Sequence, residues 1–412
     1  MLVMRRLYSK IPPKKIVFEQ ERGTKNRKSS KVLRYTMDND NWCSYSKYRK
    51  WQNWFRANED HTNHIKLLSY NILSQDLLMK HIYLYLDIDQ ALLKWEYRLS
   101  KLQEEVLSLK PDILCLQEMQ YDHLKKFVEA IDGEDNFEYI YKKKTGTYTD
   151  GCAIIYDRRK FRLIDEYTVE YHRSPVGLLN RDNIAVIAKL CTKGNYSKSI
   201  CPGNHVSNFI ILKMYNHISI QITNGIHHTI YYKNKIVSTL FSQMFTFLVA
   251  TTHLLYNPKR EDVRLAQINL LLTKLECLSL NADSTHRLPI LLTGDFNFQP
   301  FSIPYEFVNT GTLDRNQLSD IKFDTNNEKL SHDLKLISAY DEYSASTFQN
   351  KWITVDYIFY SSQENKNSIK IWSVYNLPSK RMCYEMGRIP NRILGSDHLC
   401  VAVTFSVESS TT

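Results

Sequence analysis

A group of polar side chains stands at or near the ends of short apolar runs, and their types could bind a metal ion or move protons. The group supplies four carboxylates, two amides and two imidazoles, namely Asn71, Glu118, His253, Asp295, Asn297, Asp356, Asp397 and His398. Each has a plain structural explanation by itself, since Asn71 could occupy a turn and His253 could be a hydrogen-bonded core histidine. As a set, their oxygen atoms suit Mg²⁺, which takes few protein carboxylates and keeps water molecules for a substrate. No cysteine belongs to the set, which argues against a zinc or redox centre.

The apolar runs predict the elements that must position these residues. Strand-like runs cover residues 65–73, 112–116, 245–253, 290–293, 352–360 and 399–405. Apolar residues at helical spacing predict one helix over 91–110, which Pro111 stops. A broadly apolar run that starts with two acids predicts another over 261–280. Mixed strands and helices of this kind predict an α/β sandwich with a polar site at one end of its sheets.

Six of the polar segments occur in an order that resembles one superfamily. They are SYNILSQ at 69–75, CLQE at 115–118, THL at 252–254, GDFN at 294–297, VDYI at 355–358 and GSDH at 395–398. This order is similar to that of the deoxyribonuclease-I-like superfamily, and to its branch of carbon-catabolite-repressor-type deadenylases and Nocturnin. Within that branch the chain resembles the Angel family through KTG at 144–146, TDGCA at 149–153, LLNRDN at 178–183 and LYNPKR at 255–260. The resemblance implies a four-layered α/β sandwich, in which two packed mixed β-sheets are flanked by helices.

The resemblance also implies a metal site. Glu118 would be the main Mg²⁺ ligand, supported by Asn71, and Mn²⁺ would be the substitute ion. Asp397 would hold metal-bound water or a second metal ion.

The remaining residues of the set would act on the phosphate. Asp295 would orient or deprotonate the attacking water, and Asn297 would hold the phosphate or that aspartate. His253 and His398 would donate hydrogen bonds to non-bridging phosphate oxygens. Asp356 would fix the tautomer and the orientation of His398.

Three further polar residues could line the substrate groove. Asp150, Arg181 and Asn183 could contact phosphate or ribose. The alternative is a salt bridge within a loop and an asparagine that begins a strand.

Basic residues are concentrated in residues 1–60, which hold 15 Lys and Arg against six Asp and Glu, whereas the rest of the chain holds 39 against 38. We expect residues 1–60 to be a partly disordered basic extension whose last part packs on the domain through Trp42, Trp51, Trp54 and Phe55. We expect residues 61–408 to form the catalytic domain. Such an arm favours binding to RNA through contacts that do not depend on the base sequence. The alternative is a solvated tail. Its basic start also allows a mitochondrial presequence, against which Pro12 and Pro13 argue.

Residues 191–244 separate two segments that otherwise resemble neighbouring strands. They are rich in Asn, Ile, Tyr, Lys and His without a clear period. Since long stretches without secondary structure are unusual inside compact domains, we expect an atypical and unstructured insert, either a surface loop or a translated intron.

The cysteines and the apolar runs bear on the compartment. No two of the eight cysteines are closer than ten positions, which predicts reduced thiols in a cytoplasmic or nuclear protein. No run approaches the ~18 apolar residues of a membrane span, so we expect no membrane contact. The leucine-rich repeats with which some relatives dock are also not expected.

Two classes of function fit this sequence. The first is a Mg²⁺-dependent phosphohydrolase at RNA 3′ ends, which the Angel resemblance makes a 2′,3′-cyclic phosphatase, with a 3′–5′ exoribonuclease or poly(A) deadenylase as the alternative. The second is an RNA- or translation-factor-binding protein with little catalysis. The complete set of polar residues favours the enzyme, whereas the fold does not determine the substrate.

Overall fold

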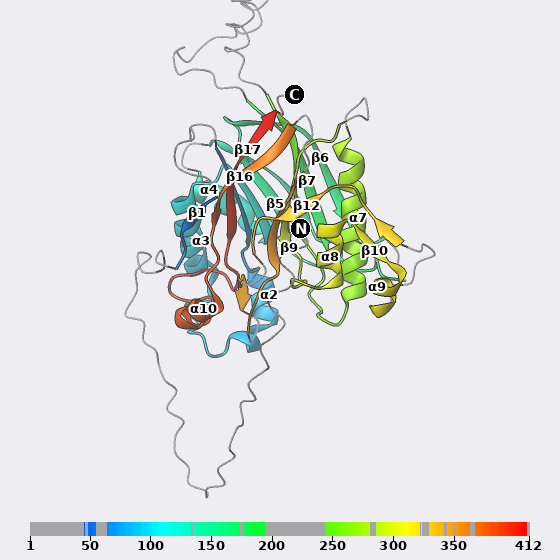
Figure 1. Cartoon of the computed structure of the whole chain (residues 1–412). Helices are drawn as coiled ribbons and strands as arrows, with labels where there is room; N and C mark the ends of the chain where they lie inside the picture. Colours follow the sequence, from blue (N-terminus) through cyan, green and yellow to red (C-terminus); the bar gives the residue numbers. More distant parts are fainter. Residues whose placement is uncertain are drawn as a thin grey trace, which may run out of the picture. The chain divides into compact units, whose positions relative to one another are not determined.

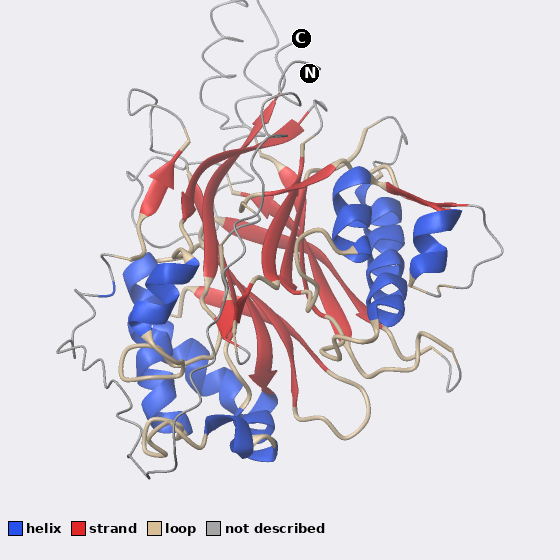
Figure 2. Ribbon diagram, turned by 60° about the horizontal axis from the view of Figure 1, so that its bottom comes forward, coloured by secondary structure: helices blue, strands red, loops and turns tan. Residues whose placement is uncertain are grey.

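Two β-sheets occupy the centre of the described chain (Figures 1 and 2). The computed structural model describes residues 45, 48–54, 64–132, 135–173, 177–193, 244–280, 286–321, 323, 329–341, 344–348, 351–362 and 367–409. All of them belong to one unit, residues 39–412. No helix in this described part is long and apolar enough to cross a bilayer.

The first sheet has seven strands and mixed direction. Its order is β1 (Trp51–Asn53), β16 (Asn367–Tyr375), β17 (Val401–Ser409), β2 (Ile65–Asn71), β3 (Ile113–Gln120), β5 (Asp150–Asp157) and β4 (Phe137–Lys143). Strands β2 and β3 are parallel, and the other neighbours are antiparallel.

The second sheet has six strands and is also mixed. Its order is β12 (Leu336–Ser338), β15 (Asp356–Ser361), β9 (Ile290–Asp295), β8 (Thr246–His253), β7 (Ile184–Thr192) and β6 (Phe161–Glu170). Strands β8 and β9 are parallel, so their carboxyl ends meet at one edge of the sheet. Two short hairpins lie outside the sheets, β10 (Thr312–Asp314) with β11 (Lys329–Ser331) and β13 (Thr347–Phe348) with β14 (Trp352–Ile353).

Helices cover the outer faces of both sheets. Helices α3 (Trp95–Leu109) and α4 (Tyr121–Ile131) pack on the seven-stranded sheet, and α7 (Glu261–Ser279) and α8 (Ile303–Thr310) pack on the six-stranded sheet. Figure 1 shows the two groups on opposite sides of the strands. The short helices are α2 (Gln75–Lys80), η2 (Ile82–Tyr85), α9 (Arg315–Asp320) and α10 (Lys380–Met386).

Alternating side chains along the strands build the layers. In β7, Ile184 and Val186 face the other sheet, whereas Ala185 and Ile187 face the helices. A strand that is buried on both faces needs apolar residues at every position, which is why this run lacks a polar alternation. The result is helix, sheet, sheet and helix, and the predicted four-layered α/β sandwich is confirmed.

The folded unit includes the described end of the basic extension. Strand β1 pairs with β16, and Tyr45 and Arg49 are buried. The Arg49 guanidinium donates to the Tyr45 hydroxyl at 2.8 Å and to the carbonyl of Cys400 at 2.6 Å. Of the expected insert, residues 191–193 and 244 are described, and residues 191 and 192 belong to β7. Residues 194–243 lie outside the described residues, as do residues 1–44.

Candidate active site

Strand register brings three of the predicted site residues together in the six-stranded sheet. His253 ends β8 and lies opposite Asp295, which ends the parallel strand β9. Asp356 begins the antiparallel strand β15 and lies on the other side of Asp295. Gly294 precedes Asp295, and a Cβ at this glycine would lie 2.1 Å from the Thr252 carbonyl oxygen, so only glycine fits where β9 approaches β8.

The seven-stranded sheet supplies Asn71 and Glu118. Asn71 ends β2, and Glu118 lies in β3 at an interruption of the ladder with β5, where its φ is +57°. Irregularities of this kind redirect a side chain, and positive φ at a non-glycine residue is enriched at functional sites. The Asn71 amide donates to Glu118 Oε1 and to Asp295 Oδ2, both at 3.0 Å. One amide therefore links the two sheets at the site.

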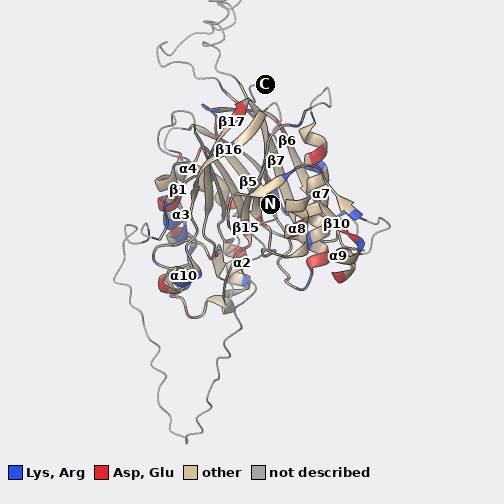
Figure 3. Cartoon of the chain, viewed as in Figure 1, with Lys and Arg blue, Asp and Glu red and all other residues tan. Residues whose placement is uncertain are grey.

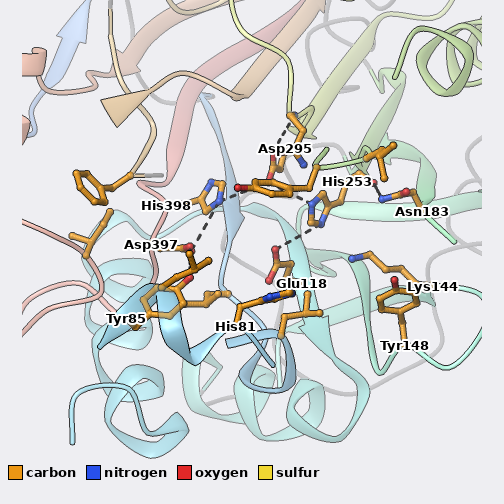
Figure 4. A pocket seen from close by; sticks show the side chains of 18 of the residues that line it. His81, Tyr85, Glu118, Lys144, Tyr148, Asn183, His253, Asp295, Asp397 and His398 are labelled. Atoms are coloured by element: carbon orange, nitrogen blue, oxygen red, sulfur yellow. Dashed lines mark hydrogen bonds and ion pairs between the residues drawn. The ribbon is translucent and has the colours of Figure 1, made fainter. Parts of the chain in front are cut away.

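The loop before β17 supplies Asp397 and His398. The Nδ1 atom of His398 donates to Asp356 Oδ2 at 2.9 Å, and its Nε2 lies 3.7 Å from Asp295 Oδ2. Figure 4 shows His398 and His253 on either side of Asp295. The Nε2 atom of His253 lies 3.5 Å from Asp295 Oδ2, and its Nδ1 lies 3.9 Å from Glu118 Oε1. The structure thus brings all of these predicted residues into one cluster.

The surroundings give the two imidazoles different charge states. Burial, with the positive charges of Lys144 and His398, holds the pKa of His253 well below its usual value. Burial also lowers the pKa of His398, but the carboxylates of Asp356 and Asp295 outweigh it, and the net pKa lies well above the usual value. Burial raises the pKa of Asp295 to about 7, against the charge of His398. His253 is therefore a neutral group and His398 a cation.

Asn297 and Asn71 make bonds that refine their predicted roles. The backbone N–H of Asn297 donates to Asp295 Oδ1 at 3.0 Å, and its side chain donates to the Leu254 carbonyl at 2.9 Å. Asn297 thus holds the aspartate through its backbone. The Asn71 side-chain oxygen accepts the Leu73 N–H at 3.0 Å, so the atom that faces Glu118 is a donor. A role for Asn71 as a metal ligand stays a prediction.

The three residues expected to line the substrate groove separate into two groups. Arg181 and Asn183 line the cavity above the cluster, and the Asn183 side chain donates to the His253 carbonyl at 3.0 Å. Asp150 pairs with Lys144, with 2.7 Å between Oδ2 and Nζ, and both are buried. Asp150 therefore holds a lysine, which was the alternative interpretation of this residue.

Sequence reasoning missed two residues that complete the site. Lys144 lines the cavity of about 390 Å³, and Figure 4 shows it extending toward Glu118 and His253. The hydroxyl of Tyr85 donates to Asp397 Oδ2 at 2.7 Å. Lys144 stands in the KTG run at 144–146, one of the runs through which the chain resembles the Angel family. Nothing in the sequence around Tyr85 indicated a role.

The donor set fits a divalent metal ion. Ligand atoms of Glu118, His253 and Asp295 lie within 4.8 Å of one another, and so do those of Asp295, Asp356 and His398. Within the described residues, the buried atoms His253 Nδ1 and Asp397 Oδ1 have no hydrogen-bond partner. Buried polar atoms are nearly always satisfied, and the carboxylates outnumber the cations here. A hard cation would supply the missing positive charge and would be coordinated by these oxygen atoms.

Comparison with known proteins gives consistent results. The model of the "Endonuclease/Exonuclease/phosphatase family" matches residues 68–398. Protein angel of Drosophila melanogaster is 38% identical over 371 residues, which cover 88% of each protein. A solved structure of ANGEL2, a 2′,3′-cyclic phosphatase, in complex with adenosine-2′,3′-vanadate, matches with a TM-score of 0.65 and 27% identity, over 87% of this chain and 98% of that chain. The human Nocturnin catalytic domain shares the fold, with a TM-score of 0.53 and 20% identity over 87% of this chain and 98% of that one.

Proposed function

Because the chain belongs to the endonuclease/exonuclease/phosphatase family and, within it, to the Angel proteins, we propose that it removes the 2′,3′-cyclic phosphate from RNA 3′ ends with Mg²⁺. The chain is a metal-dependent phosphoesterase, as its family and its fold show. Its likeness to ANGEL2, whose structure is that of a 2′,3′-cyclic phosphatase, supports the cyclic phosphate as the substrate group. The free cysteines among the described residues suit a reducing compartment, so we propose the cytoplasm or nucleus.

One observation carries the proposal, namely that Asp295 contacts groups from both sheets. Asp295 accepts a hydrogen bond from the Asn71 side-chain amide and lies between His253 and His398. The same amide also donates to the Glu118 carboxylate. A buried base with neighbouring acid and metal ligands is what hydrolysis of a phosphate ester by water requires.

The roles of the chain's residues follow from this arrangement. Mg²⁺ bound at Glu118 would supply a Lewis acid for a phosphoryl oxygen. Asp295 accepts a proton from the attacking water. The charged His398, oriented by Asp356, donates to the phosphate and stabilises negative charge that develops there. The neutral His253 can donate one hydrogen bond to another phosphate oxygen.

The overall reaction consumes two water molecules and breaks two ester bonds. The first water opens the cyclic phosphate to a monoester. The second water releases inorganic phosphate and leaves both the 2′- and the 3′-hydroxyl on the RNA. A loss of phosphate without shortening of the RNA is therefore the expected result.

The test uses the purified full chain with Mg²⁺ and two 5′-labelled RNAs. One RNA ends in a 2′,3′-cyclic phosphate, and the other ends in a poly(A) tract with a free 3′-hydroxyl. We expect phosphate release from the first RNA, no ladder from the second, and no reaction with Glu118→Ala. Glu129→Ala in helix α4 is the matched control, because that glutamate is exposed and outside the cavity lining.

Other outcomes have definite meanings. A shortening ladder on the tailed RNA would replace the cyclic phosphatase with the exoribonuclease. Tight RNA binding that survives Glu118→Ala, with no turnover by the wild-type protein, would favour a binding protein.

A further inference from the structure

A short loop between β4 and β5 holds Tyr148 at the edge of the cavity. The ammonium group of Lys143 donates to the Tyr148 carbonyl at 2.7 Å. The hydroxyl of Thr149 donates to Asp76 Oδ2 at 2.6 Å, which ties the loop to helix α2. These bonds fix the backbone on both sides of the ring, so Tyr148 has a defined place at the rim.

Two lysines lie beside the Tyr148 ring, which is 38% exposed. The Nζ atoms of Lys80 and Lys144 lie 5.8 Å and 5.6 Å from the ring centroid. Lys144 is buried and paired with Asp150, whereas Lys80 ends helix α2 at the surface. In the part of the chain that the structure describes, no acid forms an ion pair with Lys80. Its charge is available to a ligand.

On the opposite side of the cavity, the basic residue already has an acidic partner. The backbone N–H of Phe348 donates to the Asp397 carbonyl at 3.2 Å, and the Arg388 guanidinium lies 5.1 Å from the Phe348 ring. Arg388 already forms an ion pair with Asp87. Figure 4 shows Asp397 and Tyr148 on opposite sides of Glu118. Lys80, on the Tyr148 side, therefore differs from Arg388 in that no acid of the described residues forms an ion pair with it.

The charge of the rest of the unit makes this cluster distinctive. In the view of Figure 3, acidic and basic residues are mixed over the helices. The residues after 60 have nearly equal numbers of Lys and Arg (39) and of Asp and Glu (38). Attraction of a nucleic acid to this unit must therefore depend on local groups rather than on a uniformly positive face.

We propose that Tyr148 and Lys80 form a subsite for the nucleotide that precedes the reacting 3′ end of an RNA chain. Aromatic side chains stack on bases of any type, and a lysine beside them neutralises the backbone phosphate. The proposal rests on the proposed function, because it places the rest of the substrate in the same cavity. It makes the substrate an oligonucleotide, in preference to a mononucleoside 2′,3′-cyclic phosphate.

The chemistry of the substrate fits this side of the cavity. A terminal nucleoside with a 2′,3′-cyclic phosphate continues into the chain only through its 5′ phosphodiester. With the cyclic phosphate at Asp295 and His398, the next charge of the RNA needs a cation near the rim. Lys80 provides that cation, and Tyr148 provides the adjoining flat surface.

The test compares kcat/KM on a pentaribonucleotide that ends in a 2′,3′-cyclic phosphate with kcat/KM on adenosine 2′,3′-cyclic monophosphate. We expect Tyr148→Ala to lower the ratio of the two values by about 10-fold, the order of one lost base stack, mainly through KM of the pentanucleotide. Tyr148→Phe should keep the wild-type ratio, because the ring remains. Tyr384→Ala is the matched control, since Tyr384 is 68% exposed and outside the cavity lining.

The role of Lys80 is tested by a separate measurement, the dependence of KM on salt. We expect Lys80→Ala to weaken the dependence of the pentanucleotide KM on salt, because one fewer phosphate contact releases one fewer counterion. Lys126→Ala, an exposed lysine of α4, should leave that dependence as it is in the wild-type protein. A ratio that Tyr148→Ala leaves unchanged, or a salt dependence that Lys80→Ala leaves unchanged, would overturn the subsite.

A binding measurement separates this proposal from the proposed function. If the wild-type protein releases phosphate from neither substrate, the cyclic phosphatase fails, and the subsite is tested with a 5′-fluorescein RNA that has a 3′-hydroxyl. A Kd about 10-fold higher for Tyr148→Ala than for Tyr148→Phe supports the subsite. Equal Kd values for the two variants overturn it.

Discussion

Two histidines contact the same carboxylate, and their other neighbours decide what each can do. His398 has Asp356 at its far nitrogen, whereas the far nitrogen of His253 has no hydrogen-bond partner among the described residues. Only His398 is therefore held in one orientation by a side chain. A group that must stabilise charge on a phosphate benefits from such fixation, because no reorientation is needed during the reaction.

We predict that Asp356→Asn lowers kcat by roughly 100-fold, at the lower end of what a positioned acid or base contributes. The substitution keeps the shape of the side chain but removes the carboxylate that binds His398 Nδ1. KM should change little, because Asp356 has no direct contact with the substrate in the proposed arrangement. Steady-state kinetics at one pH, with thermal unfolding to confirm the fold, measure both values. A wild-type kcat would show that His398 needs no carboxylate partner.

At this scale the sequence predicted the eight residues that meet in the cluster, but not Lys144 and Tyr85, which contact or adjoin them. His253, Asp295 and Asp356 each end or begin an apolar run, which is a local signal. Tyr85 and Asp397 lie 312 positions apart, and their contact depends on how η2 and the last loop pack. Pairs of this kind leave no local pattern, because each partner alone looks like an ordinary loop or core residue.

Helix α3 shows how one element can position two loops of the site. Arg98 of this helix is fully buried, and its guanidinium donates to the carbonyls of Ile72, Leu73 and Gly395 at 2.8 to 3.0 Å. Ile72 and Leu73 follow Asn71 in the sequence, and Gly395 stands two residues before Asp397. A single side chain thus clamps the loop after β2 to the loop before β17.

We predict that Arg98→Met destabilises the protein by about 3 kcal/mol or more, because it leaves buried carbonyl oxygens without donors. It should also raise the Mg²⁺ concentration needed for half-maximal activity, since both loops bear site residues. Urea unfolding and a Mg²⁺ titration of activity measure the two effects. Arg381→Met, at a position whose side chain is 90% exposed, should change stability by less than about 0.5 kcal/mol. An Arg98 variant as stable as this control would refute the clamp.

The long helices were largely predictable, α3 from the spacing of its apolar residues and α7 from its length of apolar sequence. The helix expected over 261–280 is α7 (Glu261–Ser279), and the one expected over 91–110 is α3, which begins later, at Trp95. The strand expected over 352–360 is interrupted: residues 352–353 pair in a hairpin, and β15 begins at Asp356. Apolar alternation continues through the break, so only the pairing partners could reveal it.

At the scale of the whole unit, the site lies where the two sheets meet. Glu118 and Asn71 come from the seven-stranded sheet, whereas His253, Asp295 and Asp356 come from the six-stranded sheet. The sequence predicted both groups, but the way two sheets face each other depends on the whole core between them. A metal ion held at Glu118, beside the Asn71 amide that also contacts Asp295, would stabilise the junction of the two sheets.

We therefore predict that Mg²⁺ stabilises the wild-type protein, by about 2.7 kcal/mol at a concentration 100 times its Kd, because it binds the folded chain and not the unfolded one. In EDTA, Glu118→Gln should be at least as stable as the wild type, since burial raises the pKa of Glu118 and its charge is unfavourable there without a cation. With Mg²⁺ the order should reverse, because the variant lacks the ligand. Thermal unfolding of both proteins in each condition measures this. Identical shifts in the two proteins would place the metal elsewhere than between the two sheets.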